Sequence, residues 1–513
     1  MKYRNALGVA IITAIGLSGC AIKPRPISMD ERLKSMAADQ VEMYSKQEAI
    51  NGPLTFYNAL ARALKYNFDH RLSAMEGVLQ NTQLSVANMQ MLPKLTASAG
   101  YSARDEQLYS TSRLITGADT RSGIPSTSQD KRRGFADLTL AWNVLDFGVS
   151  YYQAKQQADR VLISQERKRK VVNNLIKEVL EAYWSASISE RVLPKLEPVL
   201  AQAQHALELS HTIADNRLQP MVGVLEYQRS LLRVIDQLQK LKSDLMMAKP
   251  KLAGLINAPR GKEFYLADQE NIPEPPALAT PVAKLEELGL FFRPELREEM
   301  YQERISRMDA RKEMLKILPG FTIPLSANWD SNSFLLHQLW LEAGVKMTFN
   351  LVNLVAAPKL WDSAQTQIEV AKIRRKALTV AALVQINVGY QQYLKALDGY
   401  KSAKELNQVD EGIFTAISNN ADNDAGSELE RIHAATSALA SQLEREQSLS
   451  EVYAALGNIY ASIGLNPVAG DIEHVSVGTL SHILQKNMDN WYKGQLPSVP
   501  LLASATPVGL VKH

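Results

Sequence analysis

Hydrophobic residues follow a helical period over long stretches of the chain. Two series are spaced alternately three and four positions apart: Val224, Tyr227, Leu231, Val234, Leu238, Leu241 and Leu245, and then Leu429, Ile432, Thr436, Leu439 and Leu443. This heptad spacing predicts coiled-coil helices. From Gly148 to Asp215 the only prolines are Pro194 and Pro198, so we expect a helix of about 68 residues there, roughly 100 Å long.

Between the helical stretches the period changes to two. Phe321, Ile323, Leu325, Ala327 and Trp329 alternate with polar or small residues, and so do Leu341, Ala343, Val345, Met347, Phe349 and Leu351. A weaker alternation involves Leu95, Ala97, Ala99 and Tyr101, with Leu138, Leu140, Trp142 and Val144 as its partner run. Each run has the length of a tilted transmembrane strand. The alternative is a pair of hairpins in a soluble sheet, but four strands alone can neither bury an apolar face nor close a barrel.

The chain repeats itself. Met91-Leu92-Pro93-Lys94-Leu95 and Ile317-Leu318-Pro319-Gly320-Phe321 lie 226 positions apart, and Trp142-Asn143-Val144 and Phe349-Asn350-Leu351 lie 207 apart. The first copy therefore has about nineteen extra residues, which belong in the polar stretch 102–133. Such duplication predicts two structural units of one design.

We expect the following organisation. Repeat one covers 54–280, with a helix, a β-hairpin at 93–147 and a long helical hairpin at 148–257; repeat two covers 281–467, with a hairpin at 319–354 and a helical hairpin at 355–464. Residues 20–53 form an N-terminal anchor segment, and the helical pattern fades in a C-terminal tail at 468–513. The fold class is mainly α, with four transmembrane strands per subunit.

The N-terminus predicts export. Lys2 and Arg4 precede the apolar stretch 7–17, which ends in Leu17-Ser18-Gly19-Cys20. This resembles the lipobox of bacterial lipoproteins, so residues 1–19 are the expected signal peptide and Cys20 the lipidation site. Cys20 is the only cysteine, so no internal disulfide can form. A plain secretory signal with an incidental cysteine is the alternative. By resemblance to such lipoproteins, Ala21 in place of Asp favours sorting to the outer membrane.

Composition excludes several functions. The net charge is only +3 and no basic tract is present, so nucleic acid is not an expected partner. The eight histidines show no helical metal-site spacing, and no nucleophile elbow or dinucleotide fingerprint occurs. Gly254 and Gly261-Lys262 imitate a phosphate loop poorly and are interpreted as a turn that ends a helix. We expect no enzyme activity, no cofactor and no metal.

The order of helix, hairpin and long helical hairpin, repeated once, resembles the TolC family of outer-membrane channels. The residues that carry the resemblance are Leu92-Pro93-Lys94-Leu95, Asp146-Phe147-Gly148, Leu225-Glu226-Tyr227-Gln228-Arg229 and Arg293-Pro294-Glu295-Leu296-Arg297, over residues 54–467. The resemblance implies a homotrimer with a twelve-stranded barrel in outer-membrane lipid and an α-barrel in the periplasm. It also implies a periplasmic adaptor and an inner-membrane pump, of ABC or RND type, as partners.

Three groups of residues follow as candidate sites. The lumen-facing strand residues are Thr322, Ser326, Asn328, Glu342, Lys346, Thr348 and Asn350. Asp422, Asp424 and Glu428 near the second helical turn form either a carboxylate ring at a periplasmic gate or an ordinary solvated turn. Arg217, Leu218, Pro220 and Gly426 form the candidate adaptor-docking turns, although Arg217 and Asp424 stand where many relatives have glycine.

The function expected from these features is a passive export conduit, gated at its periplasmic tip, in a tripartite system. Drug efflux and type I protein secretion use the same architecture, and the sequence does not separate them. The alternative from another class is a lipid-anchored periplasmic coiled-coil adaptor or scaffold. That class resembles a single helical hairpin inserted in small β-domains, so the duplication and the four strands argue against it.

Overall fold

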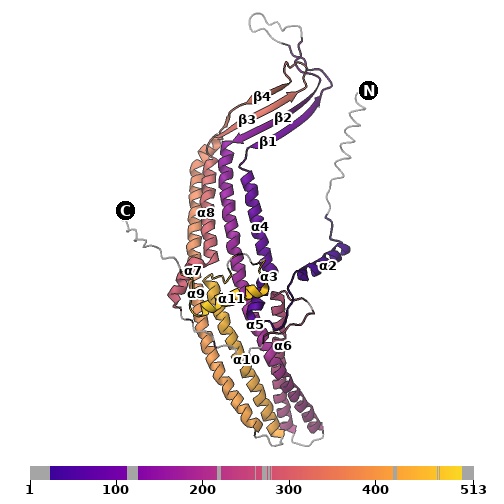
Figure 1. Ribbon diagram of the computed structural model, residues 1–513, viewed down its shortest axis with the longest axis vertical. Coiled ribbons are helices and arrows are strands. Elements are labelled where there is room, and N and C mark those ends of the chain that lie inside the picture. The colour runs from indigo at the N-terminus through magenta and orange to yellow at the C-terminus, as the bar shows by residue number, and fades with distance from the viewer. Residues whose placement is uncertain are drawn as a thin grey trace, which may run out of the picture. The chain divides into compact units, whose positions relative to one another are not determined.

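The computed structural model describes residues 24–111, 125–215, 221–259, 261–267, 274, 278, 280–419, 425–468, 470, 472 and 474–498 (Figure 1). The chain divides into two compact units. The first unit consists of Met1–Asn51 and Ala258–Glu263, and the second of Gly52–Asn257 and Phe264–His513.

The first unit contains helix α2, Met29–Ser45. Ser28 begins the helix with a capping box, because its hydroxyl accepts from the backbone N–H of Glu31 while the Glu31 carboxylate accepts from the N–H of Ser28. No residue of α2 is buried. The sequence pattern did not reveal this helix, which lies inside the expected anchor segment.

The second unit contains helices and one antiparallel sheet. Its helices are α3 (Phe56–Tyr66), α4 (Phe68–Met89), α5 (Val144–Asp215), α6 (Met221–Leu255), α7 (Val282–Phe292), α8 (Pro294–Leu315), α9 (Leu351–Asn419), α10 (Ala425–Ser462) and α11 (Val477–Tyr492). Its strands are β1 (Lys94–Ala103), β2 (Arg132–Asn143), β3 (Gly320–Asp330), β4 (Leu339–Ala343) and β5 (Lys346–Thr348). Among the described residues, no helix is long and apolar enough to cross a membrane.

Both hairpins lead into a long helix by the same device. The Asn143 side-chain oxygen accepts from the N–H groups of Leu145 and Asp146, at 3.0 and 3.1 Å. The Asn350 side-chain oxygen accepts from the N–H of Val352, at 3.1 Å. These asparagines satisfy donors that a helix leaves unpaired at its start. The two matched sequence blocks around them therefore encode strand-to-helix junctions, and the helices begin at Val144 and Leu351, a few residues before the expected 148 and 355.

Heptad positions that the sequence predicted as a core are buried in α6 and α10. Leu231, Leu238 and Leu245 are buried with Val192 and Leu196 of α5. Ile432 and Leu443 of α10 enter the same cluster. The heptad stripe of α6 therefore packs on α5, its partner in the first helical hairpin, and α10 packs beside it.

The helical pattern was expected to fade after residue 467, and the structure has one further helix, α11, within that segment. Helix α11 buries Leu480, Leu484, Met488 and Trp491, and packs on α3. The Tyr57 hydroxyl donates to the Asp489 carboxylate at 2.9 Å, which joins α3 to α11 across 432 positions of sequence. The apolar spacing of α11 is helical, but it extends over only 16 residues, too few for the period to stand out in the sequence.

One glycine fixes the end of α10. Gly464 has φ +76°, and a Cβ there would lie 2.6 Å from the Arg293 Cα and the Phe292 carbonyl oxygen. Both the left-handed backbone and the contact require glycine.

We expect Gly464→Ala to lower the free energy of unfolding by about 2 kcal/mol or more. Gly399→Ala, whose Cβ meets nothing within 4 Å in the middle of α9, should instead stabilise by about 1 kcal/mol. Thermal unfolding of the purified variants measures both effects. If the two variants shifted the unfolding temperature by the same amount in the same direction, Gly464 would not be required to be glycine.

Candidate functional site

The sheet has one apolar face and one polar face. Strand order is β1-β2-β3-β4, with β5 also on β3. In this register Ala97, Leu138, Ala327 and Leu341 form one cross-strand row, and Leu140, Leu325 and Ala343 form the next. Because side chains alternate along a strand, the apolar positions of all the strands share one face.

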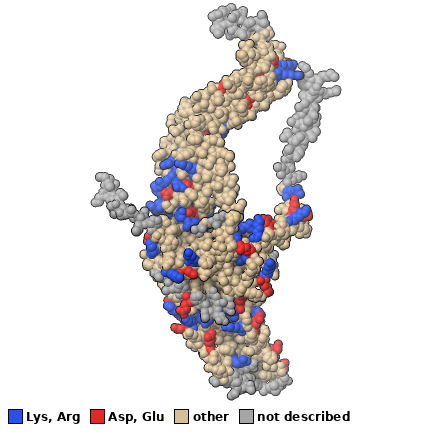
Figure 2. All heavy atoms as spheres, in the orientation of Figure 1, with Lys and Arg blue, Asp and Glu red and all other residues tan. Residues whose placement is uncertain are grey.

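The apolar face is open to solvent in the single chain. Leu341 is 79% exposed and Val345 74%. The other large exposed hydrophobic residues on this face are Leu95, Tyr101, Leu138, Leu140, Trp142, Phe321, Ile323, Leu325, Trp329, Leu339 and Met347. In the view of Figure 2 the sheet shows few charged atoms, whereas charged atoms are frequent over the helices. A contiguous exposed surface of this size marks contact with a membrane or with another protein.

The opposite face brings together most of the expected lumen residues. Ser326 pairs with Glu342, Asn328 with Trp340, and Thr322 with Lys346. Asp137 and Thr139 of β2 lie beside Asn328 and Ser326 on the same face. Thr348 pairs with Gly320 at the helical end of the sheet. Asn350 is a correction, since β5 ends at Thr348 and the Asn350 side chain caps α9 instead of standing in a strand.

Pro324 explains why the fourth strand is divided. β4 and β5 keep one register on β3, since Leu325 pairs with Ala343 and Thr322 with Lys346. Between them the Gly344 N–H donates to the Pro324 carbonyl at 3.1 Å, but proline has no N–H to return the bond. The sheet ends in β1 on one side and β4 and β5 on the other.

At the end of the sheet away from the helices, two loops are tied together. Asn332 is buried, accepts from the Asp130 N–H at 3.0 Å and donates to the Ser128 carbonyl at 3.0 Å. The Ser333 hydroxyl donates to the Asp130 carboxylate at 2.9 Å. These bonds join residues some two hundred positions apart, so they hold the two hairpins in one sheet.

The helices below the sheet are joined by charged pairs. Buried Glu166 of α5 binds Arg297 of α8 at 3.1 Å, and buried Asp159 binds Arg304. Glu303 of α8 binds Arg375 of α9 at 2.8 Å, and its hydrogen bond from Arg307 holds the pKa of the Glu303 carboxyl below its ordinary value. Removing one partner of a buried pair leaves an uncompensated charge, so these contacts fix how α8 lies on its neighbours.

Polar contacts also join the two helical hairpins. Arg191 of α5 binds buried Glu446 of α10 at 3.1 Å, and Lys195 donates to the Gln442 side-chain oxygen at 3.1 Å. Farther along, the Ser230 hydroxyl of α6 lies 2.7 Å from the His433 ring of α10. Sequence reasoning missed these residues, because partners more than two hundred positions apart carry no local signal.

Buried His70 gives a pH test. Burial and then the nearby Lys168 charge lower the pKa of His70 below its ordinary value of 6.5. Above pH 6.5 the imidazole is neutral whether the chain is folded or unfolded. As the pH falls through 6.5 the unfolded chain binds the proton more readily, so folding stability falls until the pKa of the folded state is passed.

We therefore expect the unfolding temperature of the wild type to drop more steeply from pH 7 to pH 5.5 than that of His70→Gln. The exposed His482→Gln variant is the control and should keep the wild-type slope. If the unfolding temperatures of wild type and His70→Gln fell in parallel with pH, the pH dependence could not be assigned to His70.

Several expected site residues lie outside the described residues. These are Cys20, Arg217, Leu218, Pro220, Asp422 and Asp424. Gly426 and Glu428 fall within the first turn of α10, where only the backbone is described. The helices that flank the two turns are α5 with α6 and α9 with α10.

Solved structures of other proteins share this architecture. The Campylobacter jejuni outer membrane channel CmeC matches with a TM-score of 0.61 at 13% identity, over 91% of this chain and 97% of that one. The open state of the Neisseria gonorrhoeae outer membrane channel MtrE matches with 0.55 at 15%, over 78% and 88%. The Vibrio cholerae outer membrane protein VceC matches with 0.58 at 12%, over 80% and 96%.

The chain has the fold of an outer-membrane channel protein. The expected resemblance to the TolC family is thus confirmed for the fold. No protein-family model matches the sequence, and no curated protein matches it in sequence.

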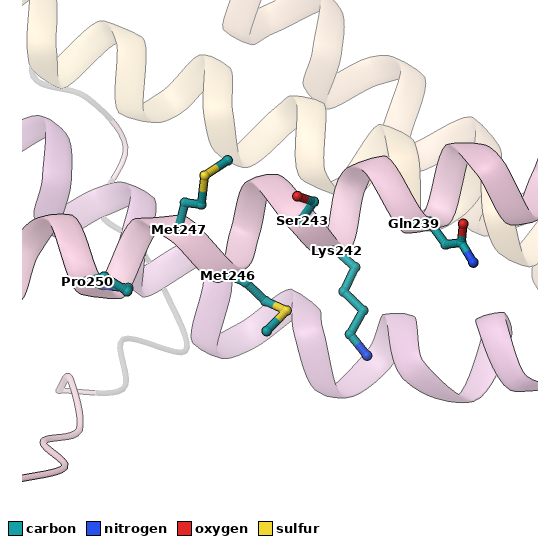
Figure 3. A pocket seen from close by; sticks show the side chains of 6 residues that line it. All are labelled: Gln239, Lys242, Ser243, Met246, Met247 and Pro250. Atoms are coloured by element: carbon teal, nitrogen blue, oxygen red, sulfur yellow. The ribbon is translucent and has the colours of Figure 1, made fainter. Parts of the chain in front are cut away.

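The described residues contain no group of three or more His, Cys, Asp or Glu side chains that could hold a metal ion. A shallow hollow of about 520 Å³ lies along α6 and is lined by Gln239, Lys242, Ser243, Met246, Met247 and Pro250 (Figure 3). Its one charged group, Lys242, pairs with Glu197 at 3.0 Å. The hollow therefore offers no converging polar groups to a ligand.

Proposed function

We propose that this chain is the subunit of an outer-membrane export channel and that three copies close one barrel. The observation that carries the proposal is the sheet, whose apolar face is exposed along its length while its two edge strands have no partner within the described chain. Lipid can cover such a face, and closure of the sheet removes its edges. Four strand positions per copy give twelve in a trimer, an even number suited to an antiparallel barrel.

The helices support a ring of copies. They pack in the order α4, α5, α8, α9 next to the sheet, and α6, α5, α10, α9 farther from it. The outermost helices both carry exposed apolar stripes. On α4 these residues are Leu72, Met75, Leu79, Val86 and Met89, and on α9 they are Val370, Ile373, Val380, Val384 and Val388. A stripe on each edge suits a head-to-tail contact that closes into a ring.

The polar face of the sheet would line the water-filled pore. Thr322, Ser326, Asn328, Glu342, Lys346 and Thr348 are the proposed wall residues, and the barrel continues into an α-barrel in the periplasm. The conduit is passive. An inner-membrane pump and a periplasmic adaptor supply energy and open the tip, where Asp422, Asp424 and Glu428 are the proposed gate residues and Arg217, Leu218, Pro220 and Gly426 the proposed docking turns.

Anchoring is proposed at Cys20, after removal of residues 1–19. An acyl chain on Cys20 would hold the N-terminus at the outer membrane. Mass spectrometry of the mature protein tests this, since the Cys20→Ala variant should lose the lipid mass while the barrel still inserts.

Conductance in a planar lipid bilayer tests the channel itself. Purified oligomers should give stable, uniform steps, whereas an equal amount of heat-unfolded protein should give none. If folded oligomers gave no current steps, the proposal would be overturned and the adaptor alternative favoured.

A comparison of culture-supernatant proteins between wild-type and deletion strains then separates the two kinds of export. In type I secretion one large protein should disappear from the medium, whereas in small-molecule efflux the secreted proteins should be unchanged.

A further inference from the structure

The apolar face of the sheet continues past the strands onto α5. Val144, the first residue of α5, continues the apolar series of β2, and Phe147 and Tyr151 follow at spacings of three and four. These spacings place the three side chains on one face of the helix, and each is at least 40% exposed. The rings of Trp142 in β2 and Phe147 meet edge to face at 6.2 Å, which makes the apolar surface continuous from strand to helix.

The second repeat has the same arrangement. Leu351 begins α9 in the apolar series of the fourth strand and is 67% exposed, and Leu354 follows at 57%. These two residues lie 207 positions after Val144 and Phe147, which is the offset of the matched blocks. Trp361, seven positions after Leu354, extends this face and is exposed. The exposed apolar residues at the starts of α5 and α9 form a collar next to the sheet.

The position of α5 argues against a neighbouring copy as the cover of the collar. Helix α5 packs between α4 and α8 of its own chain, so in the proposed ring it does not lie at a boundary between copies. The exposed face of α5 then meets either the pore or the surroundings of the ring. Because Val144 continues the apolar series of β2, the collar follows the face proposed to meet lipid, not the polar face proposed to line the pore.

The height of the sheet leaves room for the collar in lipid. Phe321 and Trp329 mark the two ends of the apolar face on β3, eight residues apart. At about 3.4 Å per residue and a tilt of about 40°, they differ by roughly 21 Å in height. The apolar band of an outer-membrane barrel is about 25 Å tall. Val144 comes one residue after the last pair of β2 and β3, about level with Phe321, and the first turn of α5 brings Phe147 about 5 Å farther.

Tyr151 and Lys155 fit the layer of lipid headgroups beyond that band. Tyr151 lies two turns into α5, and Lys155 follows one turn later on the same face. The exposed Lys155 ammonium lies 4.6 Å from the centre of the Tyr151 ring. Tyrosine rings and lysine side chains settle where the apolar layer meets water, and an ammonium there pairs with lipid phosphate.

The hydrogen bonds at the helix starts suit the same surroundings. Water pairs the first N–H groups of a helix where no side chain does so, and the apolar layer of a membrane offers no water. At α5 the Asn143 side chain accepts from two of these groups, and at α9 the Asn350 side chain accepts from the Val352 N–H. The two asparagines thus supply partners that lipid cannot.

We infer that the first turns of α5 and α9 lie in the membrane leaflet next to the periplasm. Val144, Phe147 and Leu354 contact acyl chains, and Tyr151 and Lys155 contact the phosphates of a phospholipid surface. This inference rests on the proposed function, which puts the apolar face of the sheet in the outer membrane. It moves the boundary of the membrane from the ends of the strands to the second turn of α5.

Quenching of a fluorophore by brominated lipid tests the inference in the full-length protein. Tyr151→Cys, Leu354→Cys and Leu325→Cys each carry a bimane label, in vesicles of phosphatidylcholine brominated either near the headgroup or near the chain ends. Unsubstituted protein, treated in the same way, gives the background from Cys20. We expect the labels at Tyr151→Cys and Leu354→Cys to be quenched at least twofold more by bromine near the headgroup, and the label in the middle of the sheet, at Leu325→Cys, to show the reverse preference.

Gln365→Cys is the matched control. Gln365 is exposed on the same face of α9 as Leu354, but three turns farther from the sheet. Its label should show less than a fifth of the lipid quenching at Leu354→Cys and should be quenched by iodide in the surrounding water.

The outcomes separate this inference from the proposed function. If lipid quenched only the Leu325→Cys label, the membrane would end at the sheet and the inference alone would be wrong. Iodide quenching at Tyr151→Cys and Leu354→Cys would then place the collar in water, and resistance to both quenchers would mean that protein covers it. If lipid did not quench the Leu325→Cys label either, the sheet would not be in the membrane, and the proposed function would fail together with the inference.

Discussion

We expect Leu325→Arg to abolish insertion of the sheet into the outer membrane. Leu325 lies at the middle of β3, on the apolar face, with Leu140 and Ala343 beside it. A charged side chain facing lipid at this depth costs about 2–4 kcal/mol in each copy. Since 1.4 kcal/mol is a factor of ten, the amount of folded protein in the outer membrane should fall at least tenfold, as measured by fractionation and by heat-modifiable migration on gels.

Ser326→Arg is the matched control, one residue along the strand and on the opposite face. Its new guanidinium would stand beside Glu342 in the proposed pore, where water solvates it. This variant should insert normally, but three added charges at one height should shift the ion selectivity of the bilayer current toward anions. Normal insertion of Leu325→Arg, or failure of Ser326→Arg alone, would mean that the faces are assigned the wrong way round.

Much of the fold follows from local pattern. Alternation predicted four strands because a strand with one apolar face shows period two, but it did not predict the break that divides the fourth strand into β4 and β5. The heptads predicted α6 and α10 because their core stripes are uninterrupted. The sequence shows the residues around Asn143 and Asn350 as a repeated block. It does not show that the two asparagine side chains cap helices, and Asn350 was therefore assigned to a strand. A single asparagine after an alternating run continues the pattern equally well whether it pairs in the sheet or caps a helix.

The contacts between distant parts could not be predicted. Nothing local indicates that Glu446 meets Arg191 or that Asn332 joins two loops, because each partner alone is an ordinary polar residue. Helix α11 was missed for another reason. Leu480, Leu484 and Met488 are correctly spaced, but the helix is short and its cover is supplied by α3, more than four hundred positions away. The candidate gate and docking turns remain predictions.

The stripes on α4 and α9 give a second prediction with a large expected effect. Leu79 is 54% exposed on α4 and belongs to its apolar stripe. If the next copy covers the half of the side chain that is still exposed, burial contributes roughly 1 kcal/mol to each contact. Beside the α9 stripe lie Lys372, Arg374 and Lys376, so Leu79→Arg adds charge repulsion to the loss of burial. We expect predominantly monomers by light scattering in detergent, whereas Asn81→Arg, exposed on α4 away from the stripe, should leave the oligomer intact.

Mixing two variants shows whether the contact is head-to-tail. Val380→Arg disables the α9 edge and leaves the α4 edge intact, and Leu79→Arg does the reverse. Each variant alone can form no contact, because every contact needs one edge of each kind. An equal mixture should instead give dimers, since the intact α9 edge of one variant meets the intact α4 edge of the other, and such a dimer cannot grow. Dimers of either variant alone would point to a contact between identical edges, which could not build a ring of three.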